Sequence, residues 1–185
     1  MSEKRLTILA FCGSLRRLSY NRMALNAAKV LLPDKAQIET FEIEGIPAFN
    51  QDLEQNPPII VKEFKRKIKA ADAILIATPE YNYSIPGVLK NAIDWASRPY
   101  GDNAFNGKPV AIMGASIGMI GTARAQYHLR QCFVFLNMRA VNQPEVMIPF
   151  AQEKFDENGN LKDERIKESI RALIQALINL AQPTP

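Results

Sequence analysis

Short apolar runs alternate with amphipathic helical patterns along this chain, and this alternation is the strongest constraint on its fold. The runs at residues 6–11, 73–77 and 109–113 are almost continuously apolar, which is typical of strands buried on both faces. Helical spacing of apolar residues separates and follows them, at residues 23–32, 59–70, 88–97, 124–136 and 165–181. Strands that alternate with helices predict a parallel sheet with helices on both faces.

The remaining strands complete the predicted sheet. Residues 37–43 alternate polar and apolar side chains, which suits a strand near an edge. Residues 140–141 and 146–148 lie on either side of Pro144 and predict a short or interrupted fifth strand. Five strands favour an α/β, flavodoxin-like three-layer sandwich with a five-stranded parallel sheet in the order 2-1-3-4-5. The length predicts a single domain, 1–185, in which residues 44–58 form a long connection that includes a surface loop at 50–58.

The charge pattern argues against a nucleic-acid or membrane partner. The net charge is +4, but the basic residues are scattered, apart from a cluster on the helix expected at 59–70. We interpret that cluster as a solvated helix face; it consists of Lys62, Lys65, Arg66, Lys67 and Lys69. No apolar run approaches the roughly 18 residues that span a bilayer. The run after the charged N-terminus lacks the features of a signal peptide.

A polar segment at residues 13–21 joins the first buried strand to the first helix. Backbone N–H groups and the positive end of the helix dipole converge at such a junction, which is typical of an anion site. The segment has neither the Gly-Lys-Ser/Thr of a Walker loop nor the three glycines of a dinucleotide fingerprint. We expect it to anchor a phosphate monoester through Ser14, Ser19, Asn21 and Arg16. The alternative is a turn that merely caps the helix with a serine.

A second polar loop follows the strand at 73–77. Pro79 and Pro86 fix φ near its two ends, so that its backbone groups could contact the edge of a planar heterocycle. Tyr81, Asn82 and Tyr83 would add a flat wall and an amide. The alternative is that this segment caps the next helix or lines an interface.

A third loop follows the strand at 109–113. Gly114, Gly118 and Gly121 would let its backbone approach a ligand closely, although a flexible turn is the alternative. Ligands of doubly wound sheets bind beyond the carboxyl ends of the strands. We therefore expect all three loops to form one site.

No combination of side chains in the sequence predicts acid–base or nucleophilic catalysis. His128 lies in a predicted helix without metal-type partners, and Glu80 has no histidine or second carboxylate near it in sequence. Cys12 and Cys132 lie far apart without metal-ligand spacing, which predicts structural thiols, no metal site and a reducing, cytoplasmic compartment. Trp95 is expected to fill the core or to lie beneath the loops.

Two motifs together closely resemble the NAD(P)H-dependent FMN reductases, and within them the bacterial quinone and chromate reductase branch. The first is Gly-Ser-Leu-Arg-x-x-Ser-x-Asn at residues 13–21, and the second is Thr-Pro-Glu-Tyr-Asn-Tyr-Ser-Ile-Pro-Gly from residue 78, continuing to Trp95. The resemblance extends over residues 5–148. It implies non-covalent FMN, with NADPH or NADH as co-substrate.

The resemblance also implies where FMN binds and how subunits meet. The residues implied around the phosphate are Ser14, Arg16, Ser19, Tyr20 and Asn21. Those implied around the isoalloxazine, largely through their backbone, are Pro79, Glu80, Tyr81, Asn82, Tyr83 and Ser84, with Ser116 and Gly118 closing the other side. Relatives form dimers or dimer-pair tetramers, with contacts at positions matching Tyr83, Arg124, Tyr127 and Glu145. Thr122 stands where many relatives carry a glycine.

The implied activity is a ping-pong hydride transfer from NAD(P)H through the flavin to a small electrophile. Quinones are the expected acceptors, together with chromate, azo or nitro compounds and free flavin. The flavin carries the chemistry, so no catalytic side chain is required. One alternative is a flavodoxin-type electron carrier without a substrate of its own, although such carriers are usually acidic. Another is a regulatory or scaffold protein that uses the fold without flavin.

Overall fold

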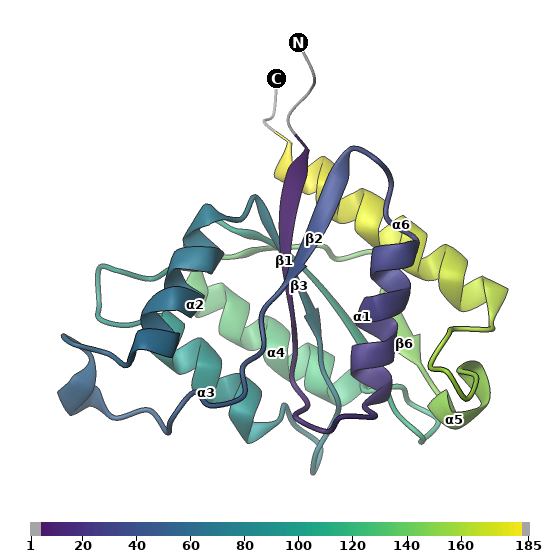
Figure 1. Cartoon of the computed structure of the whole chain (residues 1–185), viewed down its shortest axis with the longest axis horizontal. Coiled ribbons are helices and arrows are strands. Elements are labelled where there is room, and N and C mark those ends of the chain that lie inside the picture. The colour runs from purple at the N-terminus through teal and green to yellow at the C-terminus, as the bar shows by residue number, and fades with distance from the viewer. Residues whose placement is uncertain (1–4, 183–185) are drawn as a thin grey trace.

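Helices lie on both sides of one parallel sheet in the computed structural model, which describes residues 5–182 (Figure 1). The strand order is β2-β1-β3-β4-β5, and β6 also pairs with β4. Every pairing between these strands is parallel. The strands are β1 (Leu6–Cys12), β2 (Ala36–Thr40), β3 (Ala73–Ala77), β4 (Pro109–Ala115), β5 (Arg139–Ala140) and β6 (Val146–Ile148). The predicted order is confirmed.

The predicted number of five strands is wrong, because the last strand is divided in two. β5 pairs with the beginning of β4 at Pro109 and Val110, whereas β6 pairs with its end, from Met113 to Ala115. Pro144 lies between the two segments. Proline has no N–H to donate to a strand ladder, so a continuous strand could not pair through this position.

The helices follow the predicted alternation, with shifted ends. They are α1 (Tyr20–Val30), α2 (Ile59–Ala70), α3 (Gly87–Ala96), α4 (Ala123–Leu136), α5 (Ala151–Lys154) and α6 (Glu164–Ala181), with a 3₁₀ helix at Gln51–Leu53. Helix α1 begins at Tyr20 rather than at residue 23, because the Ser19 side chain caps it by accepting from the backbone N–H of Asn21. The short α5 and the 3₁₀ helix have no apolar periodicity to predict them.

Two hydrophobic cores lie on opposite faces of the sheet. Leu75 of β3 belongs to the core beneath α1 and α6, while its neighbours Ile74 and Ile76 belong to the core beneath α2, α3 and α4. This is the alternation that a strand imposes on successive side chains. Trp95 is fully buried, as predicted, and its indole N–H donates to the Pro47 carbonyl at 2.8 Å. Strands packed on both faces provide a rigid frame for the loops that follow them.

Candidate functional site: three loops at the carboxyl ends of the strands

The three polar loops predicted from the sequence meet at one cavity. It has a volume of about 210 Å³ and lies beyond the ends of β1, β3 and β4. Its lining residues are Ser14, Arg16, Ser19, Tyr20, Asn21, Pro79, Glu80, Tyr81, Ala115, Ser116 and Ile117. Pockets that enclose an entire drug-sized ligand measure roughly 300–1,000 Å³. This cavity therefore suits one end of an extended ligand, with the remainder lying along the surface.

The first loop presents hydrogen-bond donors at the beginning of α1. Among the residues that line the cavity here, Ser14 and Tyr20 have backbone N–H groups for which the described chain offers no acceptor. The Ser14 hydroxyl accepts from the Arg16 N–H at 3.3 Å, and the Ser19 hydroxyl accepts from the Asn21 N–H at 3.2 Å. A hydroxyl that accepts through its oxygen can still donate its hydrogen. This set of donors fits a phosphate group at a helix N-terminus.

The Arg16 side chain is held close to the protein surface. Its guanidinium donates to the Leu18 carbonyl, from Nε at 3.0 Å and also from Nη2, and its Cζ lies 5.5 Å from the centre of the Tyr20 ring. These contacts keep a positive charge at the mouth of the first loop. A guanidinium in this position can favour an anion through its charge and its remaining N–H groups.

Asn21 connects the first loop to the third. Its side-chain Nδ2 donates to the Ala115 carbonyl at 2.9 Å, while its Oδ1 accepts from the Ala115 N–H at 2.8 Å. The residue is 3% exposed. Its amide therefore satisfies the last backbone groups of β4, and Asn21 sets the distance between two of the loops.

The second loop folds into a β-hairpin with a two-residue turn. Tyr81 and Ser84 exchange both backbone hydrogen bonds at 3.0 Å. The turn residues Asn82 and Tyr83 both have positive φ, 50° and 67°, as a type I′ turn requires. Asparagine tolerates this conformation, but a tyrosine there is an outlier that its surroundings must stabilise.

Helix α4 stabilises the hairpin from outside the cavity. The Arg124 guanidinium lies 3.5 Å from the centre of the Tyr83 ring and also pairs with the Glu80 carboxylate. Glu80 accepts from the Ala125 N–H at 3.2 Å, and thus caps α4. Its carboxylate is therefore engaged with α4 rather than free to bind a ligand.

Ser84 and His128 make a further connection between the hairpin and α4. The Ser84 hydroxyl lies 2.7 Å from Nδ1 of His128. Because α4 contacts the hairpin through several residues, the wall that the second loop contributes is formed before any ligand binds.

Two of the three glycines of the third loop are required by packing within the protein. A Cβ at Gly114 would lie 1.8 Å from the Thr122 hydroxyl and 2.6 Å from the Thr78 carbonyl oxygen. A Cβ at Gly121, which has φ of 54°, would lie 2.8 Å from the Ile148 nitrogen. A Cβ at Gly118 would meet only the Ser116 hydroxyl oxygen, at 3.6 Å, and the Gly118 N–H donates to the same hydroxyl at 3.1 Å. Packing within the protein, which the sequence does not indicate, thus requires glycine at two of the three positions.

The structure also shows which predicted residues lie away from the cavity. Asn82, Tyr83 and Ser84 form the turn of the hairpin and its far strand, and Gly118 lies further along the third loop; none of them lines the cavity. Conversely, Ala115 and Ile117 line it and were not predicted. Both are adjacent to Ser116, but an apolar side chain next to a polar one carries no sequence signal for a binding role.

The cysteines are poor candidates for nucleophiles. Burial raises the pKa of the Cys12 thiol, which is 6% exposed, and burial likewise raises the pKa of the Cys132 thiol. Both therefore stay protonated near neutral pH. Both are free thiols. Among residues 5–182, no group of three His, Cys, Asp or Glu side chains is placed to hold a metal ion.

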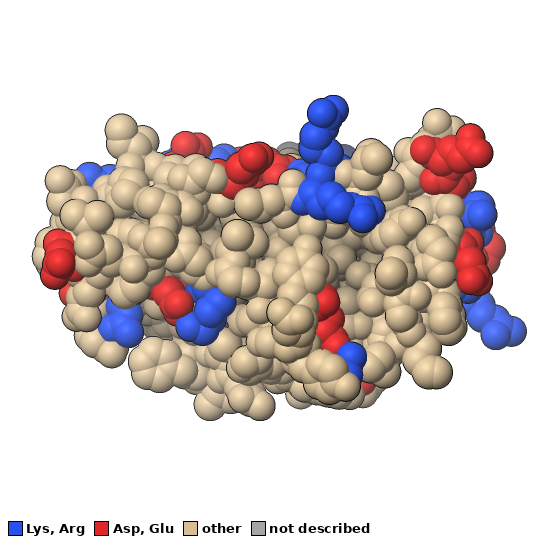
Figure 2. All heavy atoms as spheres, turned by 90° about the horizontal axis from the view of Figure 1, so that it is seen from below, with Lys and Arg blue, Asp and Glu red and all other residues tan. Residues whose placement is uncertain are grey.

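The face that carries the site is mostly uncharged. Figure 2 shows the molecule from below, the side on which β1 and β3 end in Figure 1, and its basic and acidic residues form small separate groups. This distribution favours a small ligand over a polyanion. A larger cavity of about 500 Å³ lies elsewhere, beside α2. The site is assigned by its chemistry and its place at the strand ends, not by its volume.

The fold is that of a flavodoxin-like α/β protein, and the cavity at the carboxyl edge of its sheet suits a phosphorylated ligand. Residues 6–153 match the family model described as NADPH-dependent FMN reductase. The chain belongs to this family. Its cofactor is accordingly FMN and its electron donor is NAD(P)H, and the donors around the first loop fit the phosphate of FMN.

Similar proteins support this assignment over nearly the whole chain. An NAD(P)H-dependent FMN reductase of Pseudomonas aeruginosa is 54% identical over 173 residues, which is 93% of each chain. A 2-hydroxy-1,4-benzoquinone reductase of a Burkholderia species is 43% identical, covering 91% of this chain and 92% of that protein. Among solved structures, the NAD(P)H:acceptor oxidoreductase FerB of Paracoccus denitrificans has a TM-score of 0.88 and 35% identity, with 95% of this chain and 97% of that chain covered.

Proposed function

We propose that this protein reduces quinones with electrons from NAD(P)H, using FMN held across the three loops. The observation that carries the proposal is the convergence of those loops on one cavity, with phosphate-type donors on one side and a preformed hairpin on the other. The similarity to a benzoquinone reductase supports the acceptor class. Chromate, azo and nitro compounds and free flavin are further acceptors that an open surface site could admit.

The first loop would hold the phosphate. The backbone N–H groups of Ser14 and Tyr20 and the hydroxyls of Ser14 and Ser19 would donate to its oxygens. The amide of Asn21 is already engaged with Ala115. We therefore assign Asn21 to positioning the phosphate loop rather than to contacting the phosphate through both of its amide atoms.

The second and third loops would hold the isoalloxazine between them. Pro79, Glu80 and Tyr81 line the cavity, and the Glu80 side chain is turned towards α4. The ring would therefore contact backbone groups on this side and Ser116 on the other. Bound FMN would accept a hydride from NAD(P)H in the first half-reaction and would donate electrons to the quinone in the second. The protein's task is to bind and align the reactants, for which good geometry contributes roughly 7–11 kcal/mol.

Thr122 would not restrict the approach of a nicotinamide or a quinone. Its side chain is buried, with 1% of the residue exposed, and it packs against Gly114 beneath the loop. The third loop would therefore present its backbone to the ligand much as a glycine at this position would allow.

We further propose that the protein is a homodimer or homotetramer located in the cytoplasm. Tyr83 is 72% exposed on the hairpin, next to the site. The exposed Tyr127 hydroxyl donates to Glu145 at 3.1 Å, on the same side of α4 as Arg124. Such polar and aromatic groups beside a site suit a subunit contact. The free thiols of Cys12 and Cys132 suit a reducing compartment.

Rapid-mixing kinetics test the proposed function. FMN-loaded protein is mixed anaerobically with NADPH or NADH, and the flavin absorbance at its visible maximum is followed; a benzoquinone is then added to the reduced protein. We expect fast bleaching followed by fast recovery, with parallel lines in double-reciprocal plots of steady-state rates. A protein that stays oxidised with both nicotinamides, but accepts electrons from a reduced protein partner, would instead be an electron carrier.

A further inference from the structure

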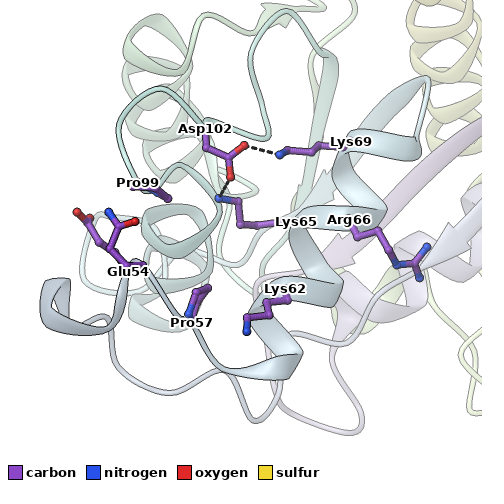
Figure 3. A pocket seen from close by; sticks show the side chains of 9 residues that line it. Glu54, Pro57, Lys62, Lys65, Arg66, Lys69, Pro99 and Asp102 are labelled. Atoms are coloured by element: carbon purple, nitrogen blue, oxygen red, sulfur yellow. Dashed lines mark hydrogen bonds and ion pairs between the residues drawn. The ribbon is translucent and has the colours of Figure 1, made fainter.

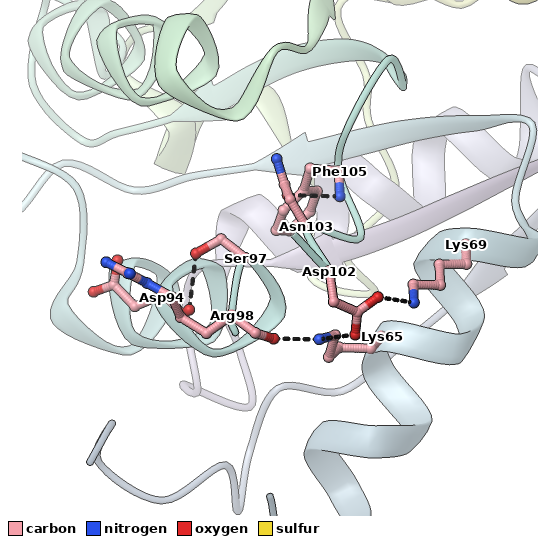
Figure 4. Close-up of polar contacts among 8 residues, drawn as sticks. All are labelled: Lys65, Lys69, Asp94, Ser97, Arg98, Asp102, Asn103 and Phe105. Atoms are coloured by element: carbon pink, nitrogen blue, oxygen red, sulfur yellow. Dashed lines mark hydrogen bonds and ion pairs between the residues drawn. The ribbon is translucent and has the colours of Figure 1, made fainter. Parts of the chain in front are cut away.

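Side chains that join distant segments lie both away from the three loops and next to them. Away from the loops, basic residues of α2, among them Lys65 and Lys69, line the larger cavity (Figure 3). Asp102 accepts from Lys65 at 2.7 Å and also from Lys69, and Lys65 donates to the Arg98 carbonyl (Figure 4). The Lys65 side chain is only 9% exposed, so the interpretation of the whole cluster as a solvated face is wrong for Lys65. These contacts attach the segment after α3 to α2, and none of these residues lines the cavity of the three loops.

Gln126 of α4, in contrast, makes contacts that lead to the third loop. The residue is 1% exposed. Its side-chain Nε2 donates to the Val146 carbonyl at 3.0 Å and to the Thr122 hydroxyl at 3.2 Å. An amide nitrogen has two N–H donors, and both are thus used. Thr122 ends the third loop, and Val146 begins β6, so that one buried side chain joins a helix, a loop and a strand.

The far end of the third loop has a backbone conformation that its surroundings must stabilise. Thr122 has φ of 74°, which is an outlier for a β-branched residue. Its side chain makes no capping hydrogen bond to α4. Instead its hydroxyl oxygen accepts from the Gln126 side chain, and its carbonyl accepts from the Gln126 backbone N–H at 3.0 Å. Gln126 therefore holds this end of the loop through both its backbone and its side chain.

The near end of the third loop is held by β6 and the segment that follows it. The Ser116 N–H donates to the Ile148 carbonyl, and the Ser116 carbonyl accepts from the Ala151 N–H, both at 3.0 Å. Ile148 is the last residue of β6, and the first is Val146, whose carbonyl accepts from Gln126. Ser116 itself lines the cavity. A shift of β6 would therefore move a wall of the cavity.

Packing alone does not account for an amide at position 126. The Oε1 atom of Gln126 is buried without a hydrogen-bond partner among residues 5–182, and an unpaired buried acceptor destabilises a protein. A methionine would fill a similar volume without this acceptor. The two Nε2 donors, which hold the strand and the loop, are what distinguish glutamine from methionine here.

We propose that Gln126 is a positioning residue for the flavin reaction. By holding the third loop at both ends, it sets where Ser116 and Ile117 meet the isoalloxazine, although it contacts neither flavin nor substrate. The inference rests on the proposed placement of the ring between the second and third loops. It requires that binding of the ring depends on Gln126 and that binding of the phosphate, which is placed at the first loop, does not.

Two flavins that differ only in the phosphate test this requirement. The full-length protein, freed of FMN, is titrated with FMN and with riboflavin, and flavin fluorescence gives both dissociation constants. In Gln126→Met, we expect both constants to rise by the same factor, about tenfold, because the ring is common to the two ligands. Ser14→Ala/Arg16→Ala should instead weaken FMN alone. The control is Asp102→Asn, which removes ion pairs away from the loops and should leave both constants unchanged.

Thr122→Val is a second, milder variant, which removes only the hydroxyl at the far end of the loop. It should raise both dissociation constants by about twofold or more, and it decides the question if Gln126→Met does not fold. The proposal is overturned if folded Gln126→Met or Thr122→Val binds both flavins as the wild type does, if either variant weakens FMN alone, or if Asp102→Asn has the same effect as Gln126→Met. A failure of the proposed function would differ, since the wild type would then bind both flavins without being reduced by NAD(P)H or reoxidised by a benzoquinone.

Discussion

The side-chain amide of Asn21 pairs with both backbone groups of Ala115, at 2.8 and 2.9 Å, across 94 positions of sequence. The amide lies beside the end of β4 and makes the two hydrogen bonds that a residue of a neighbouring strand would make there. One buried side chain thus joins the phosphate loop to the loop expected to contact the flavin ring.

Asn21→Ala is expected to lower both stability and FMN affinity. The substitution leaves a buried N–H and a buried carbonyl of Ala115 without partners, which costs about 2–4 kcal/mol. Urea unfolding of the FMN-free protein measures this loss. The control is Asn26→Ala on the exposed side of the same helix, which should change stability by less than about 0.5 kcal/mol. Equal stability of the two variants would contradict the structural role of Asn21.

Ser14→Ala combined with Arg16→Ala is expected to weaken FMN binding about tenfold or more, with little effect on folding. Ser14 loses a donor and Arg16 a charge from the first loop, while neither residue belongs to a hydrophobic core. Flavin fluorescence titration measures the affinity. A double variant that stays fully yellow through gel filtration would show that the phosphate binds elsewhere. The matched change Ser169→Ala/Arg171→Ala on α6 should leave FMN bound.

Gly114→Ala is expected to destabilise the protein by about 3 kcal/mol, whereas Gly118→Ala should be tolerated. The new methyl group would meet the Thr122 hydroxyl and the Thr78 carbonyl oxygen, and a backbone oxygen at the end of a strand cannot move away. Adding Thr122→Gly should restore only part of the loss, because the contact with Thr78 remains. Thermal denaturation of the three variants gives the comparison, and similar melting temperatures for Gly114→Ala and Gly118→Ala would contradict it.

His128→Ala is expected to leave the rate of flavin reduction nearly unchanged. The ring contacts the Ser84 hydroxyl on the outer side of the hairpin, and other contacts from α4 hold the hairpin when this one is lost. Single-turnover reduction by NADPH measures the rate. General acid–base catalysis contributes roughly 10²–10⁴-fold. A thousandfold fall with FMN still bound would therefore give His128 a catalytic role.

Asp102 is expected to make stability depend on pH at the acid end. Its pKa is lowered in the folded protein by Lys65 and Lys69, so its contribution is complete above the ordinary aspartate pKa of about 3.9 and is lost as pH falls through the lower, folded value. Asp102→Asn should reduce stability at pH 7 and flatten the wild-type decline below about pH 4. Urea unfolding of both proteins from pH 7 to pH 3 tests both effects. If the free energy of unfolding depends on pH in the same way in the wild type and in Asp102→Asn, the ion pairs of Asp102 with Lys65 and Lys69 do not stabilise the fold.

Local sequence patterns are sufficient to predict the order of the strands and the positions of the main helices. Helix α2 begins and ends where its apolar spacing predicts, at Ile59 and Ala70, and β3 matches its continuous apolar run. Apolar spacing predicts the start of α1 three residues too late, because its first turn carries polar residues; the capping serine, Ser19, is the better signal. The convergence of the three loops followed from the parallel order of the strands, since strand ends meet at one edge.

Contacts between distant segments could not be predicted in the same way. Nothing near Glu80 in the sequence indicates that its carboxylate caps α4, because its partners lie 44 and 45 positions away. The burial of Lys65 likewise depends on Asp102, on a loop that α2 meets only in the folded protein. The sequence also does not indicate why residue 114 must be a glycine, because the atoms that leave no room for a side chain there belong to other segments of the chain.

The attachment of the hairpin to α4 has a consequence for evolving new acceptor preferences. Residues 124, 125 and 128 touch no part of the cavity, yet they set the position of the turn that includes Asn82 and Tyr83. Substitutions that remove the Arg124 and His128 contacts together would shift this turn while leaving every residue that lines the cavity chemically intact. Mutant libraries aimed at altered acceptor selectivity should therefore randomise residues of α4 as well as the residues that line the cavity.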